Sequence, residues 1–273
     1  MSLFYDTHAH LAYPDYTSDL AAVLDRATAA GIAKIICVAT DLASSQQAIT
    51  LSEKYPQIFA AVGWHPSDAH LAPSDFEETL FKLAKHPKVV AIGETGLDYY
   101  RLPSKSTQGS AADDQKVIAG QRDLFVKHLT IAKELGLNCI IHQRDSLADT
   151  LRYLKPFCQQ VRAVFHCFVD DLSAAERIFE LNGLVSFTGI ITFKNAQLIR
   201  QTLAAIPRDK FMLETDCPYL APVPFRGKRC EPSHTREIAL TSAEVRNCTL
   251  DELSNFTCST ADAFFRRRLV LTT

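Results

Sequence analysis

Short apolar runs alternate with amphipathic helical segments along almost the whole chain, and this alternation is the strongest constraint on the fold. Apolar runs without polar alternation are typical of parallel strands that are buried on both faces. The eight predicted strands span residues 3–5, 33–38, 58–62, 89–92, 138–141, 163–165, 184–187 and 211–213. The predicted helices span residues 18–30, 42–54, 75–85, 121–135, 147–154, 174–181, 197–205, 235–246 and 250–266. Eight strand–helix units favour a closed, TIM-like (β/α)8 barrel over an open doubly wound sheet.

One segment interrupts the alternation. Residues 102–116 are rich in Ser, Gln, Asp and Gly without clear periodicity, which predicts a long polar loop. Ser18 is the predicted N-cap of the first helix, and the basic run Arg266-Arg267-Arg268 is expected at a solvated helix end. Because no shift in composition marks a boundary, we expect residues 1–273 to form a single domain.

The composition argues against several classes of protein. A net charge of −2 gives no global basic field to attract nucleic acid, so binding of a polyanion would need a local patch or a metal. No GxGxxG follows the first strand and no GxxxxGK[ST] occurs, which argues against a dinucleotide or P-loop site. No apolar run approaches the ~18 residues of a membrane span. Scattered cysteines and the absence of a signal-peptide pattern predict reduced thiols in a cytoplasmic protein.

Histidines and carboxylates gather at the predicted carboxyl ends of the strands. The first strand leads into Asp6-Thr7-His8-Ala9-His10, where strand alternation places both imidazoles on one face. The other strand ends contribute His65, Glu94, His142, His166 and Asp216. In a barrel these ends lie on one rim, where such barrels place their chemistry. Any one of these histidines also has a structural interpretation, but their recurrence at successive strand ends predicts a metal site.

The predicted ligands offer nitrogen and carboxylate oxygen but no thiolate. Such a set suits Zn, Mn, Ni or Fe, and it suits Mg where water completes the shell. We expect two divalent cations, whose charge would exceed that of two carboxylates and attract phosphate or a developing oxyanion. A water shared by both ions would be a hydroxide-like nucleophile at neutral pH. Glu94 and Asp216 are the candidate catalytic residues for handling the proton.

Specific motifs follow the predicted strands. They are Asp6-Thr7-His8-Ala9-His10, Gly63-Trp64-His65-Pro66, Gly93-Glu94-Thr95-Gly96-Leu97-Asp98-Tyr99-Tyr100, His142-Gln143-Arg144-Asp145, His166-Cys167-Phe168, Thr192-Phe193-Lys194-Asn195, Leu213-Glu214-Thr215-Asp216-Cys217-Pro218-Tyr219-Leu220 and Arg226-Gly227-Lys228-Arg229. Together they resemble the TatD family of metal-dependent hydrolases over nearly the whole chain. The resemblance implies a TIM-like barrel with two divalent metals and hydrolytic activity, typically that of a deoxyribonuclease and often that of an exonuclease on single strands.

The resemblance also implies a ligand set. One metal would be held by His8, His10, Glu94 and Asp216, and the other by Glu94, His142 and His166, with Glu94 as the bridge. Related amidohydrolase barrels often bridge with a carbamylated lysine on the fourth strand, so a glutamate favours the TatD branch.

The chain departs from the family pattern at two positions. Ser67 stands where family members often complete His-Pro-His, and Cys230 stands where they often have asparagine before Glu-Pro. Neither is a ligand, but both could alter substrate contacts. The resemblance therefore predicts the substrate of this chain less directly than it predicts the metal site.

Basic and aromatic residues near the strand ends are the candidate substrate contacts. Arg144, two residues past His142, is well placed for a phosphate. The other basic candidates are Arg101, Lys194, Arg226, Lys228 and Arg229. The candidates for stacking on unpaired bases are Tyr99, Tyr100 and Phe193, with packing at the rim as the competing interpretation. His65 would orient substrate or bond within the rim, and Asp6 would orient His8 or make a buried barrel hydrogen bond.

Three functions are compatible with these residues. The main hypothesis is a metal-dependent nuclease that hydrolyses ester bonds of single-stranded DNA, and by extension RNA. The second keeps the metals and hydrolyses another ester or an amide, as a deacylase or amidohydrolase on a small or tRNA-linked substrate, since the fold does not choose between them. The third is a binding protein without turnover, against which the complete ligand set argues.

Overall fold

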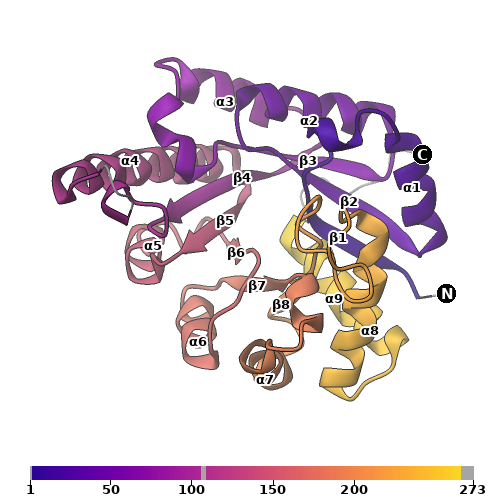
Figure 1. Ribbon diagram of the computed structural model, residues 1–273. Coiled ribbons are helices and arrows are strands. Elements are labelled where there is room, and N and C mark those ends of the chain that lie inside the picture. The colour runs from indigo at the N-terminus through magenta and orange to yellow at the C-terminus, as the bar shows by residue number, and fades with distance from the viewer. Residues whose placement is uncertain (1, 106–108, 266–273) are drawn as a thin grey trace.

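Eight parallel strands surround one central axis with helices outside them, so the (β/α)8 barrel expected from the sequence is confirmed (Figure 1). The structure is a computed structural model that describes residues 2–105 and 109–265; the Arg266-Arg267-Arg268 run lies outside them. The strands are β1 (Phe4–Ala9), β2 (Ile32–Val38), β3 (Ile58–Val62), β4 (Val89–Asp98), β5 (Asn138–Arg144), β6 (Ala163–Phe165), β7 (Leu184–Phe187) and β8 (Phe211–Leu213). Each strand pairs in parallel with the next one along the chain.

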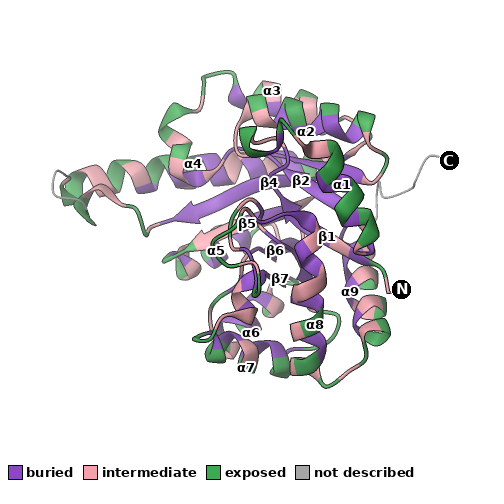
Figure 2. Cartoon of the chain, turned by 45° about the vertical axis from the view of Figure 1, so that its right-hand side comes forward, coloured by how far each residue is buried: buried purple, intermediate pink, exposed green. Residues whose placement is uncertain are grey.

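The helices cover the barrel and turn a buried face toward it and an exposed face outward (Figure 2). They are α1 (Leu20–Ala29), α2 (Leu42–Lys54), α3 (Phe76–Ala84), α4 (Ala111–Leu135), α5 (Leu147–Leu154), α6 (Leu172–Glu180), α7 (Gln197–Ala205), α8 (Thr235–Arg246) and α9 (Leu250–Phe265). Short 3-10 helices are η1 (Pro14–Tyr16), η2 (Pro66–Leu71), η3 (Pro103–Lys105), η4 (Gly189–Thr192) and η5 (Pro232–His234).

The barrel interior is filled with apolar side chains. One buried cluster contains residues from β2 through β8, among them Phe59, Val164 and Met212. Residues from seven strands can meet in this way only within the barrel. Phe264 and Phe265, at the end of α9, belong to the same cluster and are 2% exposed. The final helix therefore packs against the interior core that supports the site.

The seam between the first and last strands is closed by a buried carboxylate. Asp6, which is fully buried, accepts hydrogen bonds from the Thr215 backbone N–H (2.9 Å) and hydroxyl (2.6 Å). It also accepts from the backbone N–H of His8 at 3.3 Å, and not from the His8 ring. Of the two roles expected for Asp6, the buried barrel hydrogen bond is the one observed. Beyond it, the Asp216 N–H donates to the His8 carbonyl at 2.9 Å.

Several predicted boundaries were wrong. The predicted loop over 102–116 is not a loop throughout: α4 begins at Ala111 after Ser110, whose hydroxyl accepts from the Asp113 N–H at 3.3 Å. Its first turns are exposed, so no apolar stripe marked them as helix. Ser18 is not the N-cap of α1. The helix begins at Leu20, so the N-cap position is that of Asp19.

Strands β4 and β5 are longer than predicted, since β4 continues to Asp98 and β5 to Arg144. Gly93 and Gly96 led to the prediction that β4 ends before them. Gly96 is nevertheless required within the strand. It has φ 127°, and a Cβ atom added to it would lie 2.1 Å from the His142 carbonyl oxygen. Any side chain would push β5 and its histidine away from β4.

Replacing Thr215 with valine tests the closure of the seam. Thr215→Val keeps the shape of the side chain but leaves a buried carboxylate oxygen without its hydroxyl donor. We expect the free energy of unfolding of metal-free protein to fall by about 1–3 kcal/mol, measured by urea denaturation. Thr257→Val is the matched control, because the Thr257 hydroxyl only donates to the Leu253 carbonyl within α9. Equal losses in the two variants would contradict a special role for the seam.

A buried histidine predicts part of the acid sensitivity. His128 of α4 is fully buried; its Nε2 accepts the Trp64 N–H at 3.0 Å, and its Nδ1–H donates to the Leu124 carbonyl at 2.8 Å. Burial lowers the pKa of His128 from 6.5 to about 4. Between these values the unfolded chain binds a proton that the folded chain does not, so stability falls as the pH drops through this range.

From about pH 7.5 to pH 5 we expect His128 to account for a loss of ~2 kcal/mol in the free energy of unfolding. His128→Gln keeps an acceptor for the Trp64 N–H but does not titrate. Its urea-unfolding free energy should therefore decline less steeply over the same interval. Parallel declines for wild type and variant would refute the assignment.

Candidate metal centre

The first group of candidate ligands comes from the two ends of the barrel sequence. His8 lies in β1 and His10 directly follows it, and their Nε2 atoms face each other at 3.3 Å. Asp216 follows β8, and its Oδ1 lies 3.7 Å from His8 Nε2 and 3.3 Å from His10 Nε2. The Asp216 backbone has φ 59°, a left-handed conformation that aspartate tolerates better than most residues. The seam hydrogen bonds thus bring together ligands far apart in sequence.

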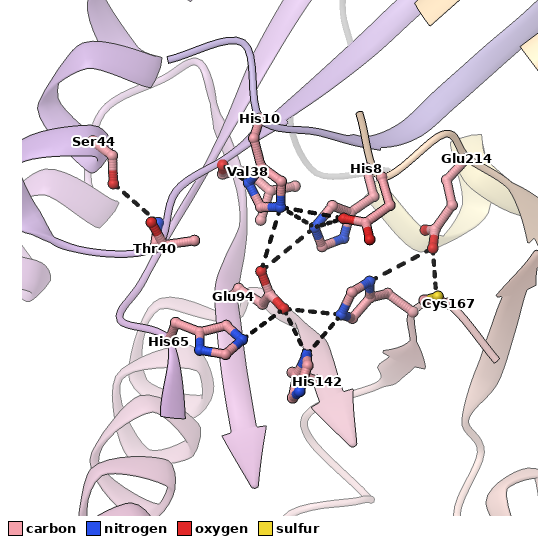
Figure 3. A network of polar contacts seen from close by, with 12 residues as sticks. His8, His10, Val38, Thr40, Ser44, His65, Glu94, His142, Cys167 and Glu214 are labelled. Atoms are coloured by element: carbon pink, nitrogen blue, oxygen red, sulfur yellow. Dashed lines mark hydrogen bonds and ion pairs between the residues drawn. The ribbon is translucent and has the colours of Figure 1, made fainter. Parts of the chain in front are cut away.

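Glu94 lies between two groups of histidines (Figure 3). It is 2% exposed, within β4. Its Oε2 lies 3.6 Å from His8 Nε2 and 3.7 Å from His10 Nε2. Its Oε1 lies 2.9 Å from both His142 Nδ1 and His166 Nε2. One oxygen therefore faces each group, as a bridging ligand requires.

Hydrogen bonds to the backbone and to a second carboxylate set the orientation of two of these rings. His10 Nδ1 lies 2.9 Å from the Val38 carbonyl, which can only accept, so the proton is on Nδ1 and the Nε2 lone pair is free. His142 lies between two carboxylates, with Nε2 3.2 Å from Asp98 Oδ2 and Nδ1 2.9 Å from Glu94 Oε1, so with a cation at the centre Asp98 would keep the ring proton on Nε2 and free Nδ1. A ring that carries one proton would thus present an unprotonated nitrogen to a cation at the centre, as metal binding requires.

Asp98 is itself held firmly. It is 3% exposed, and its Oδ1 accepts from the Tyr100 N–H at 2.9 Å. The side-chain amide of Gln121 in α4 bonds both the N–H (2.8 Å) and the carbonyl (2.9 Å) of Asp98. Helix α4 thereby fixes the end of β4 and, through Asp98, the ring of His142.

Glu214 supports the turn that carries His166. This buried carboxylate accepts from the Cys167 N–H and from the Ser186 hydroxyl, both at 2.6 Å. Its Oε1 also lies 3.6 Å from His166 Nδ1. A second buried carboxylate thus lies behind a second histidine of the centre.

The electrostatics favour a cation. Burial alone would raise the pKa of Glu94, but His166, His65 and His142 hold it well below its usual range, so the carboxyl is ionised. Burial would lower the pKa of His166, but Glu94 and Glu214 raise it well above normal. The negative charge that draws protons to these rings would equally draw divalent cations.

The donor set fits a metal site. Nitrogen and carboxylate oxygen atoms lie within 4.8 Å of one another in the groups His8–Glu94–His166, His8–His10–Asp216 and His65–Glu94–His142. Two facing imidazole nitrogens repel each other unless a proton or cation lies between them, as His8 and His10 illustrate. The candidate ligands are therefore brought together in an arrangement that suits metal ions.

Among residues 2–105 and 109–265, none of the helices combines the length and the apolar character that a membrane span needs.

Two candidate substrate arginines are stacked on aromatic rings at the surface. The Arg144 guanidinium lies 3.6 Å from the centre of the Tyr100 ring, and that of Arg226 lies 3.8 Å from the Phe193 ring. Arg144 and Tyr100 are exposed. Stacking limits the rotamers of these side chains, so less entropy is lost when they bind an anion.

Other predicted contacts have partners elsewhere. Arg229 makes a paired contact with Asp19 (2.9 and 2.7 Å), which ties the segment after β8 to the start of α1. The Tyr99 hydroxyl donates to Asp149 of α5 at 2.9 Å and accepts from Arg122 of α4, so it points toward those helices. Lys194 and Lys228 are exposed. Their roles toward substrate stay predictions.

The sequence interpretation gave no role to Asp98, Glu214 or Tyr13. Asp98 shares strand parity with Glu94, but the signal was hidden because β4 was predicted to end before either residue. Tyr13 stacks on the His10 ring, with centroids 4.8 Å apart and an interplanar angle of 8°. A lone tyrosine after the motif carried no signal for this contact.

Comparisons with known proteins agree with the geometry. The family model described as TatD related DNase matches residues 5–266. The uncharacterized metal-dependent hydrolase YabD of Bacillus subtilis (strain 168) is 38% identical over 265 residues, which cover 97% of this chain and 99% of that protein. The 3'-5' ssDNA/RNA exonuclease TatD of Klebsiella pneumoniae (strain 342) is 32% identical over 248 residues, covering 89% and 90%.

The crystal structure of YjjV, a TatD homolog from Escherichia coli K12, superposes with a TM-score of 0.87 at 29% identity, covering 96% of this chain and 98% of that one. Fold, donor set and relatives together define a metal-dependent hydrolase. The chain belongs to the TatD family, as its motifs indicated.

The bond between His142 and Asp98 gives a test of the centre. Asp98→Asn removes the negative charge behind His142, so we expect an ion bound by His142 to bind about 10–100-fold more weakly. Titration calorimetry with Mn²⁺ on metal-free protein measures this. Asp149→Asn, which removes a neighbouring carboxylate that bonds Tyr99 and Arg122, is the matched control. Unchanged affinity in Asp98→Asn would rule out the proposed support.

Proposed function

We propose that this protein is a nuclease that uses two divalent cations to hydrolyse single-stranded DNA, and RNA, from the 3' end. The observation that carries the proposal is the position of Glu94, whose two oxygens face two separate groups of ligands. The relative from Klebsiella pneumoniae named as a 3'-5' ssDNA/RNA exonuclease supports the substrate and the polarity.

One cation would be held by His8, His10, Glu94 and Asp216, and the other by Glu94, His142 and His166. Mg, Mn, Zn and Ni are the candidates, because the donors are nitrogen and carboxylate oxygen. When bound, such ions polarise the scissile phosphodiester and supply a nucleophilic hydroxide at neutral pH.

The chain's own residues would divide the remaining work. Glu94 and Asp216 hold the negative charge that fixes the ions, and Asp216, which is only partly buried, is the better placed of the two to take a proton. Arg144 and Arg226 would bind backbone phosphates, while Tyr100 and Phe193 beneath them would contact unpaired bases. A single strand suits this arrangement, since its bases are free to stack.

Reduced thiols agree with action in the cytoplasm. Cys37, Cys139, Cys217 and Cys230 are buried as free thiols within the core. Burial raises the pKa of the Cys37 thiol to about 12, which keeps it protonated and inert. We therefore place the enzyme in a reducing compartment.

The nuclease activity has a direct test. Purified protein with Mg²⁺, Mn²⁺ or Zn²⁺ should shorten an end-labelled single-stranded oligonucleotide stepwise from its 3' end, and chelation should abolish this until metal is restored. Glu94→Gln and His142→Ala should each lower the rate by at least ~1000-fold, because each breaks the metal centre.

Glu78→Gln, on the exposed face of α3, is the control and should retain full rate. Full activity in both site variants would overturn the site assignment. A parallel panel of carboxyl esters and amides, including aminoacyl-tRNA, separates the nuclease from a deacylase: cleavage there, with the oligonucleotide intact, would overturn the proposed substrate.

A further inference from the structure

The ring of His65 has a fixed proton position. His65 follows β3 and precedes η2, where its Nδ1 accepts the backbone N–H of Ser67 at 3.2 Å. A nitrogen that accepts a hydrogen bond carries a lone pair, so the neutral ring has its proton on Nε2. The local turn thus determines which end of this histidine is a donor.

The proton-bearing nitrogen points into the metal centre. His65 Nε2 lies 3.4 Å from Glu94 Oε1, and the ring lies against that of His142, with centroids 4.5 Å apart (Figure 3). The His65 side chain is 18% exposed, whereas that of His8 is fully buried. His65 therefore sits at the solvent side of the centre.

Distance alone would make His65 a metal ligand, since its Nε2 groups with Glu94 and His142. The proton positions argue against it. With a cation at the centre, His10 and His142 would keep their protons on the outer nitrogens, which face the Val38 carbonyl and Asp98, and would aim a lone pair inward. His65 does the reverse, and a protonated nitrogen has no lone pair to give a metal.

We propose that His65 is a hydrogen-bond donor to the substrate and not a metal ligand. Its Nε2–H binds a non-bridging phosphoryl oxygen of the phosphodiester at the solvent side of the centre, beside Glu94 Oε1 and the His142 ring. The identity of this acceptor rests on the proposed nuclease function. Negative charge grows on such an oxygen during hydrolysis, so a fixed N–H stabilises the transition state more than the bound substrate.

Three variants separate donor from ligand. His65→Phe keeps the ring against His142 but removes both nitrogens, and His65→Gln keeps an N–H near the position of Nε2. His70→Phe is the matched control, an exposed histidine in η2, the 3-10 helix that follows His65. Mn²⁺ titration calorimetry, competitive inhibition by inorganic phosphate and oligonucleotide turnover are measured for each, and ¹⁵N spectra of His65 report its tautomer.

We expect His65→Phe to bind the same number of Mn²⁺ ions as wild type, with affinities within about threefold, because no ligand is lost. Its kcat should fall by about 100-fold and its inhibition constant for phosphate should rise by about 10-fold, as for removal of one oxyanion donor. His65→Gln should recover part of both, and His70→Phe should match wild type. The ¹⁵N spectra should show a protonated Nε2 in metal-loaded protein.

Loss of a metal equivalent in His65→Phe, or a metal-bound Nε2, would show that His65 is a ligand. Unchanged kcat and phosphate inhibition would show that it makes no substrate contact. Failure of the proposed function appears separately, in wild-type protein that leaves single strands intact. The metal titration, the tautomer and the phosphate arm still decide the role of His65 in that case.

Discussion

The candidate metal centre depends on one buried carboxylate. Glu94 is ionised although almost no solvent reaches it, because histidines from four other strands surround it. An isolated charge at this depth would be very costly, so the carboxylate requires its partners as much as they require it. The long strand β4 carries this charge into the centre, and α4 fixes the end of that strand through Gln121. The fold is therefore organised to hold one negative charge at a fixed point.

Much of the fold and of the candidate site could be predicted from the sequence, because both follow from the periodicities of strands and helices. The apolar runs predicted all eight strands, and the strand ends predicted the six candidate ligands that the structure brings together. What the sequence could not give depends on long-range contacts. The extension of β4 past Gly93 depends on pairing with β5, and the role of Asp98 follows only from that extension. The polar first turns of α4 were not predicted as helix, because a helical segment that faces solvent has no apolar stripe.

The sequence also could not predict which ring nitrogen of each histidine carries the proton. His10, His65 and His142 have the same side chain, but the first bonds a carbonyl, the second a backbone N–H and the third a carboxylate. Each partner comes from a different local turn or strand. Chemically identical residues thereby acquire different properties, and pattern alone, which sees only residue type and spacing, cannot distinguish them.

The closure of the seam between β1 and the segment after β8 has a consequence for the order of assembly. His8 and His10 are made first and Asp216 near the end, so the nascent chain cannot complete this group of ligands until the last strand has emerged. A cation bound by all three would favour the closed seam over the open one, because its binding would stabilise only the closed form. The supply of metal would thus influence the last step of folding, the closure of the seam. An incomplete chain would offer a cation only some of these ligands.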